Sequence, residues 1–276
     1  MNDIFNLKRF GAYLRYDFIQ NRQNYGITLL VLGLMPVAIY FIWGLFSLLI
    51  GHQWAPPSPT ARWVYFACMT MVLLISYPAR AYGYITHRQA GANLLLLPVS
   101  VTEKYISMLL YSLVFVPLVY MLLYFGSDGL LSLIDPNYGE AMLKFQPFVY
   151  FNQEWQEAMT NPDAQLITEI KLPFFMLTGT ISFTLWFLLG GMIFRKHKIA
   201  LSIVAMIVLE MAYSMILSPF IMNQVQTMEQ LDEMGQAKQS MAEWMNNFII
   251  IGYVQNTVLL LALLSLIYWR LRTIKH

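Results

Sequence analysis

Long apolar runs separated by short charged segments dominate the pattern of this chain. A helix needs about 20 apolar residues to cross a hydrocarbon layer about 30 Å thick. Six runs meet that requirement: residues 25–50, 63–85, 105–125, 173–194, 199–222 and 248–269. The runs are apolar on every face, whereas the strands of a membrane β-barrel alternate over about ten residues. The pattern predicts an all-α, polytopic membrane protein with six transmembrane helices.

The composition agrees with that fold class. Hydrophobic residues make up 58% of the chain and charged residues only 12%, whereas soluble domains carry about 25% charged residues. The mean hydropathy is +0.54. A soluble fold of this size would need far more polar surface. In a membrane protein, the positions of the charges along the chain are more informative than the net charge.

Lysine and arginine are distributed unevenly between alternate connections. With a cytoplasmic N-terminus, 13 of the 17 basic residues face the cytoplasm. These are Lys8, Arg9, Arg15, Arg22, Arg80, Arg88, Lys104, Arg195, Lys196, Lys198, Arg270, Arg272 and Lys275. The other four are Arg62, Lys144, Lys171 and Lys238. Because cytoplasmic loops are enriched in these residues, both termini are predicted to be cytoplasmic.

Residues 1–24 are predicted to form an amphipathic helix at the inner membrane interface. Apolar positions recur at helical spacing, with basic residues between them. The apolar positions are Leu7, Phe10, Leu14 and Phe18, and the basic ones are Lys8, Arg9, Arg15 and Arg22. The alternative is a solvated tail. The first run is too long for a signal peptide and no small-residue cleavage pattern follows it, so we expect it to remain as a span.

Residues 25–276 are then a six-helix transmembrane domain with two long outer segments. Segment 126–171 contains repeated glycines and prolines among many aromatic residues, and it is predicted to form short helices over the outer face. The other is segment 223–247, in which residues 227–246 place several methionines roughly on one helical face. A methionine stripe is more often packing than a metal or substrate site.

Chemical motifs are mostly missing from the sequence. The single cysteine, Cys68, lies within a span, which rules out a disulfide framework or a thiolate metal site. The four histidines lie near membrane boundaries or the terminus, and no metalloprotease, hydrolase or phosphate-loop motif occurs. We therefore expect no enzyme activity, no bound metal and no cofactor on this chain. Any ATP chemistry would belong to another subunit.

Polar residues within the spans are few. Glu210 is the only acidic residue well inside one, and an ionised carboxylate there costs about 3 kcal/mol. It should line a translocation path or hold helices together, and the sequence favours neither. Gln255 and Asn256 are weaker candidates for the path, because interhelical hydrogen bonds explain them more simply. The prolines at positions 36, 78 and 117 are candidate kinks, or ordinary packing features.

The segment 87–104, HRQAGANLLLLPVSVTEK, lies on the predicted cytoplasmic side between the second and third runs. Its leucines are too few to span, and Pro98 ends them. Ser100 or Thr102 is positioned to cap the next helix, with Glu103 in the first turn where the helix dipole favours an anion. An ordinary re-entry loop is the alternative. Exposed leucines favour a contact site, because exposed apolar patches usually mark one.

These features resemble the membrane (permease) subunit of a type II ABC exporter. The likeness rests on the basic N-terminal helix, the six spans with cytoplasmic termini, and "LLLLPVS" followed by "EK" after the second span. The resemblance implies a coupling element that docks into the cytoplasmic ATP-binding ABC subunit. On this chain its residues would be Arg88, Asn93, Leu97, Pro98, Glu103 and Lys104. In many members of the family the outer segment after span three is smaller than residues 126–171.

The resemblance also implies a function. The chain would be an ATP-driven exporter subunit of the bacterial plasma (inner) membrane, moving an amphipathic or lipid-like substrate outward. Its partners would be the ATPase, a second permease subunit in a homodimer or heterodimer, and membrane lipid, with no nucleic acid. One alternative is a membrane anchor or signalling component without transport. Another is a lipid-acting membrane enzyme that uses outer acids such as Glu154 and Glu157.

Overall fold

The computed structural model describes residues 5–51, 53–86, 97–144, 172–233 and 237–273. Every regular element in these ranges is helical, and they contain no strand. Five helices among them are long and apolar enough to cross a membrane, or six if the bent pair at the N-terminal end counts as one span. The predicted class, an all-helical protein with membrane-spanning helices, agrees with this architecture.

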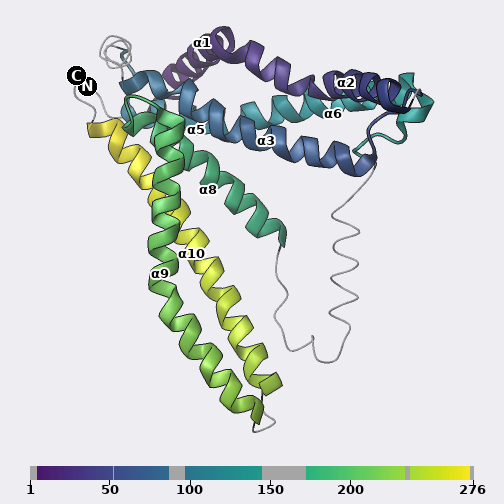
Figure 1. Cartoon of the computed structure of the whole chain (residues 1–276). Helices are drawn as coiled ribbons and strands as arrows, with labels where there is room; N and C mark the ends of the chain where they lie inside the picture. The colour runs from purple at the N-terminus through teal and green to yellow at the C-terminus, as the bar shows by residue number, and fades with distance from the viewer. Residues whose placement is uncertain (1–4, 52, 87–96, 145–171, 234–236, 274–276) are drawn as a thin grey trace.

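The helices fall into two groups that share one end. In chain order the elements are α1 (Leu7–Gly33), α2 (Met35–Gly51), α3 (Pro59–Ala81), η1 (Gly83–Thr86), α5 (Val101–Leu110), η2 (Tyr111–Phe115), α6 (Val116–Ile134), η3 (Pro136–Tyr138), α8 (Leu172–Ile193), α9 (Lys198–Glu233) and α10 (Ala237–Thr273). Figure 1 shows α1, α2, α3 and α6 running alongside one another, while α8, α9 and α10 diverge from them. Helix α8 connects the groups, because it packs against both α3 and α10.

The first predicted span is a broken helix. Helix α1 continues from the predicted interfacial segment into the first apolar run, so the predicted boundary at residue 24 lies inside one helix. The axis then bends by 49° between Gly33 and Met35. Pro36 explains the position of the bend, since its ring clashes with the carbonyl four residues earlier and it lacks an N–H. The proline predicted as a kink therefore lies next to the bend.

The third span is longer than the sequence predicted. Helices α5 and α6 and the π-helical turn η2 between them form one candidate span, Val101–Ile134. The π-turn lies just before Pro117, where the wider turn accommodates a ring that a regular helix would not. Residues 126–134, predicted to begin an outer segment, are helical. Most of segment 223–247 is also helical, in the ends of α9 and α10.

The tightest packing surrounds α8. The core includes Leu73 and Tyr77 of α3, Leu188 of α8, and Leu263 and Ile267 of α10. Two adjacent glycines allow α8 to approach its neighbours closely. A Cβ on Gly191 would lie 2.7 Å from the carbonyl oxygen of Ala79, and one on Gly190 would lie only 1.9 Å from the hydroxyl oxygen of Ser202.

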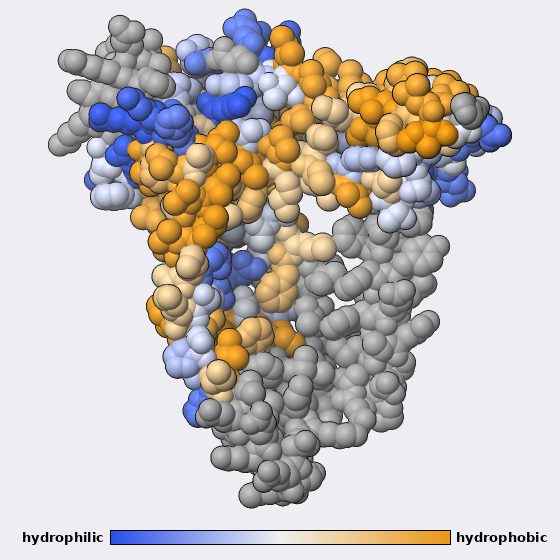
Figure 2. Space-filling model, in the orientation of Figure 1, coloured by the Kyte–Doolittle hydropathy of each residue, from blue (hydrophilic) through white to orange (hydrophobic). Residues whose placement is uncertain are grey.

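Helices α9 and α10 leave most of their apolar surface uncovered. Only 6% of the most apolar window of the α9 span is buried and 11% of the α10 window, against 56% in α8. Figure 2 shows hydrophobic surface over the upper part of this region, with polar patches among it lower down. Lipid, a second subunit or both would cover these faces in a membrane.

Candidate functional site

The beginning of α5 is fixed by a capping box. Ser100 is the N-cap, and its hydroxyl accepts a hydrogen bond from the backbone N–H of Glu103 at 3.3 Å. In return, the carboxylate of Glu103 accepts a hydrogen bond from the backbone N–H of Ser100 at 3.0 Å. Of the two residues predicted as possible caps, Ser100 has this role, and Thr102 hydrogen-bonds to the Ser100 hydroxyl. The sequence S-x-x-E therefore sets where the helix starts.

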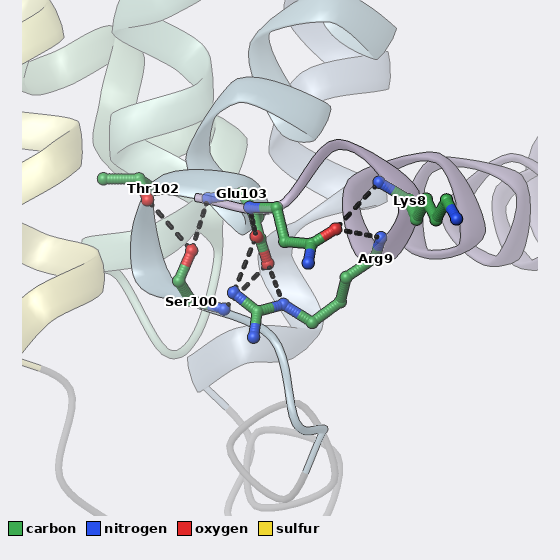
Figure 3. Close-up of polar contacts among 6 residues, drawn as sticks. Lys8, Arg9, Ser100, Thr102 and Glu103 are labelled. Atoms are coloured by element: carbon green, nitrogen blue, oxygen red, sulfur yellow. Dashed lines mark hydrogen bonds and ion pairs between the residues drawn. The ribbon is translucent and has the colours of Figure 1, made fainter. Parts of the chain in front are cut away.

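The same carboxylate joins α5 to the first turn of α1. Arg9 donates two hydrogen bonds to Glu103, from Nε at 2.8 Å and from a terminal nitrogen at 2.7 Å (Figure 3). The backbone N–H of Asn6 donates a third, at 2.7 Å. Glu103 has 0% side-chain exposure and Arg9 has 31%. This fork geometry is the strongest form of arginine–carboxylate pairing, and it raises the pKa of the Arg9 guanidinium above its ordinary value.

The other residues predicted for the coupling element lie around this contact. Lys104 is buried, and its ammonium group donates to the carbonyl oxygen of Leu97 at 3.5 Å. Leu97 packs against the core, whereas Pro98 is exposed. Arg88 and Asn93 lie outside the described residues. The structure therefore brings Leu97, Glu103 and Lys104 together, with the carboxylate turned toward α1.

Another buried carboxylate, which the sequence pattern did not indicate, contacts α5 one turn after Glu103. Asp17 of α1 is 2% exposed. It accepts hydrogen bonds from the hydroxyls of Tyr82 at 2.9 Å and Ser107 at 2.8 Å, and from the amide of Asn21 at 2.8 Å. Burial raises the pKa of the Asp17 carboxyl, and the three hydrogen bonds oppose that rise. Tyr13, Asp17 and Asn21 are spaced four residues apart, which puts them on one helix face. This spacing was the sequence feature that could have identified Asp17.

Together these contacts hold three segments at the shared end of the helix groups. Asp17 joins α1 to the residue after α3 and to α5, and Glu103 joins the first turn of α1 to the cap of α5. Helix α10 reaches the same place, since the Tyr105 hydroxyl donates to the carbonyl oxygen of Leu264 at 3.1 Å. Connections that the charge pattern assigned to one side of the membrane therefore meet at one end of the structure.

The three candidate path residues lie on α9 and α10. Glu210 is exposed on α9. Gln255 is also exposed and accepts a hydrogen bond from the Tyr213 hydroxyl, which joins α10 to α9. Asn256 donates to the Thr178 hydroxyl at 3.2 Å, which joins α10 to α8. Gln255 and Asn256 therefore make the interhelical hydrogen bonds that were the simpler interpretation of both residues.

A second polar cluster lies at the far end of α3 and α6. Arg62 donates to the carboxylate of Asp128 at 3.1 Å and to the carbonyl oxygen of Glu140 at 2.9 Å. Asp128 also accepts from the Tyr138 hydroxyl at 2.8 Å and from the backbone N–H of Met142 at 2.7 Å. Both charged side chains are buried, with 4% and 1% exposure. The sequence pattern predicted that Arg62 and segment 126–171, which contains Asp128, lie on the same side of the membrane, but it could not pair the two residues.

The described residues contain no group of three or more His, Cys, Asp and Glu side chains placed to hold a metal ion. Taken together, the helices and their buried polar contacts define a multi-pass, all-helical membrane protein. Comparison of the chain with protein-family models, curated proteins and solved structures found no match in any of the three. The resemblance to type II ABC permeases stays a prediction from the sequence pattern.

Proposed function

We propose that this chain is the permease subunit of an ATP-driven exporter and works with a separate ATPase subunit. The supporting observation is the contact between Glu103 and Arg9. It lies at the start of α5, within the segment 87–104 that the resemblance assigns to coupling with the ATPase. A displacement of that segment would act on α5 through its capped first turn and on α1 through the arginine fork.

The stiffness of this junction suits a mechanical role. The Glu103 carboxylate holds its own helix cap and the neighbouring helix at once, so α1 and α5 cannot move apart without uncovering a buried charge. Loss of Arg9 would leave the buried Glu103 carboxylate without its charge partner. Force from a partner would therefore move the two helices as a unit and would pass along the Val101–Ile134 span.

The uncovered faces of α9 and α10 support the other half of the proposal. A permease of this class would pair with a second permease subunit, and the substrate path would lie between them. Glu210 lies on the exposed surface of α9, where a second subunit would shield its charge from lipid. An apolar face with isolated polar side chains suits an amphipathic or lipid-like substrate better than a small ion.

The test is co-purification of bound chains in mild detergent, followed by mass spectrometry. The variant is Arg88→Glu with Asn93→Glu, in the predicted docking segment. The matched control is Arg272→Glu with Thr273→Glu, exposed residues at the end of α10 with the same charge change. We expect the wild type and the control to retain an ATPase with a phosphate-loop motif. The docking variant should retain about tenfold less, since a loss of roughly 1.4 kcal/mol of affinity has that effect.

Two results would count against the proposal. Absence of an ATPase from wild-type preparations in several detergents would favour the anchor or signalling role. Turnover of labelled lipid by the purified chain alone would favour the lipid-acting enzyme. Glu103 itself is unsuitable as the docking variant, because its burial makes any loss of partner binding indistinguishable from a loss of the α1–α5 junction.

A further inference from the structure

A basic pocket lies between the end of α3 and the turn that joins α8 to α9. Its volume is about 680 Å³, within the range of about 300–1,000 Å³ typical of small-ligand sites. The lining residues are Tyr25, Ala79, Arg80, Gly83, Tyr84, Arg195, His197, Lys198, Ile199, Ala200 and Ile203. Among the described residues, the lining contains two arginines, a lysine and a histidine, and no acidic residue.

Two of the pocket's four basic residues are tied to neighbouring segments by hydrogen bonds. The backbone of Arg80 is fixed because its carbonyl oxygen accepts a hydrogen bond from the Tyr25 hydroxyl at 3.0 Å. The Lys198 ammonium group donates to the carbonyl oxygen of Gly83, which ties the start of α9 to η1. Within the described part of the chain, the ion pairs are Arg9 with Glu103 and Arg62 with Asp128. None of the pocket's cations is therefore paired with a carboxylate there.

The two ends of the pocket differ in polarity. Arg195 and His197 are exposed in the turn, whereas Ile199 and Ile203 lie on the first turns of α9, a candidate membrane span. Figure 2 shows hydrophilic surface at this end of α9, next to hydrophobic surface that continues down the helix. The N–H groups and dipole at the start of a long helix also favour an anion.

We propose that this pocket binds a negatively charged phosphate group, of the kind carried by an anionic phospholipid headgroup. Arg80 and Arg195 would donate charge-assisted hydrogen bonds to the phosphate oxygens. The isoleucines of α9 would contact the beginning of an acyl chain. Basic pockets between helices on the cytoplasmic side of a membrane suit this ligand. The site requires no transport activity and stands apart from the proposed function.

The test measures binding to the purified full-length chain in a nonionic maltoside. The probes are dioctanoyl phosphatidylglycerol, dioctanoyl phosphatidylcholine, and sodium phosphate against sodium chloride at equal ionic strength. The variant is Arg80→Gln with Arg195→Gln, which leaves the Lys198 contact intact. The matched control is Arg15→Gln with Lys196→Gln, two exposed cations that do not line the pocket.

We expect saturable binding of phosphatidylglycerol, weakened about 25-fold in the pocket variant, because each of the two cations contributes about fivefold. Binding should be unchanged in the control and retained by Arg80→Lys with Arg195→Lys, which also checks the fold. Equal binding of inorganic phosphate, with no gain from the acyl chains, would support the phosphate site and assign it to a soluble compound. Equal binding of both lipids, or an equal loss in the pocket and control variants, would overturn the proposal.

Discussion

The buried pair of Arg62 and Asp128 gives the sharpest test of the packing at the far end of α3 and α6. The perturbations are Arg62→Met, Asp128→Leu and the two combined. Arg62→Met leaves Asp128 with two of its three donors, the Tyr138 hydroxyl and the Met142 backbone N–H. Asp128→Leu leaves the guanidinium without its carboxylate and both remaining donors without an acceptor.

Those differences set the expected order of the losses. Breaking a buried ion pair by removing one partner costs about 3–5 kcal/mol. Arg62→Met should lie near the lower end of that range, because Asp128 keeps hydrogen bonds that stabilise its charge. Asp128→Leu should lie near the upper end. The double variant should cost less than the sum of the single ones, since neither charge is left unpaired.

The assay is equilibrium unfolding of the detergent-solubilised chain by sodium dodecyl sulfate, followed by circular dichroism. Lys144→Met, which removes an exposed cation near the same end, is the matched control and should change stability by less than about 0.5 kcal/mol. The reasoning fails if Arg62→Met costs no more than this control. It also fails if the two single losses are additive, because the pair would then not be coupled.

Three further predictions concern the shared end of the helix groups. The carboxyl of Asp17 has a raised pKa in the folded chain, so it binds a proton more tightly there than in the unfolded chain. The wild type should therefore gain thermal stability relative to Asp17→Asn as pH falls from 7 toward about 4. Gly191→Val should destabilise the chain by about 1–3 kcal/mol in the same unfolding assay, because its side chain would meet backbone, whereas Gly179→Val in the same helix has open space. Arg9→Glu should expose α1 to trypsin, and adding Glu103→Arg should not restore protection, because an arginine cannot accept the backbone N–H groups that Glu103 accepts; full recovery would show that only the charge pair matters.

Periodicity and composition were sufficient for the helical class and for most helix positions. The second span was predicted as 63–85 and the fourth as 173–194, and the corresponding helices run over Pro59–Thr86 and Leu172–Ile193. Long apolar runs are a reliable signal because the bilayer requires them. The start of α5 was predictable for a local reason, since a capping box depends on residues three apart.

Long-range contacts explain what the sequence pattern missed. Gly126 and Gly129 suggested the start of a loop, yet α6 continues through both of them. The Ser127 hydroxyl there donates to the carbonyl oxygen of Gly33 at 3.1 Å, a contact across 94 positions. Asp17 was overlooked for the same reason, because its partners Tyr82 and Ser107 come from other helices. A short stretch of the sequence carries no information about contacts between residues that are far apart along the chain.

The sequence separation of the Arg9–Glu103 contact affects how the chain can mature during synthesis. The two residues are 94 positions apart, so α1 is made long before its partner exists. At about 5–20 residues per second, a ribosome needs roughly 5–20 s to reach Glu103 after Arg9. During that interval the first turn of α1 lacks the carboxylate that it contacts in the folded chain. Nascent chains stalled before position 103 should therefore leave Arg9 open to proteases, and those stalled well beyond it should not.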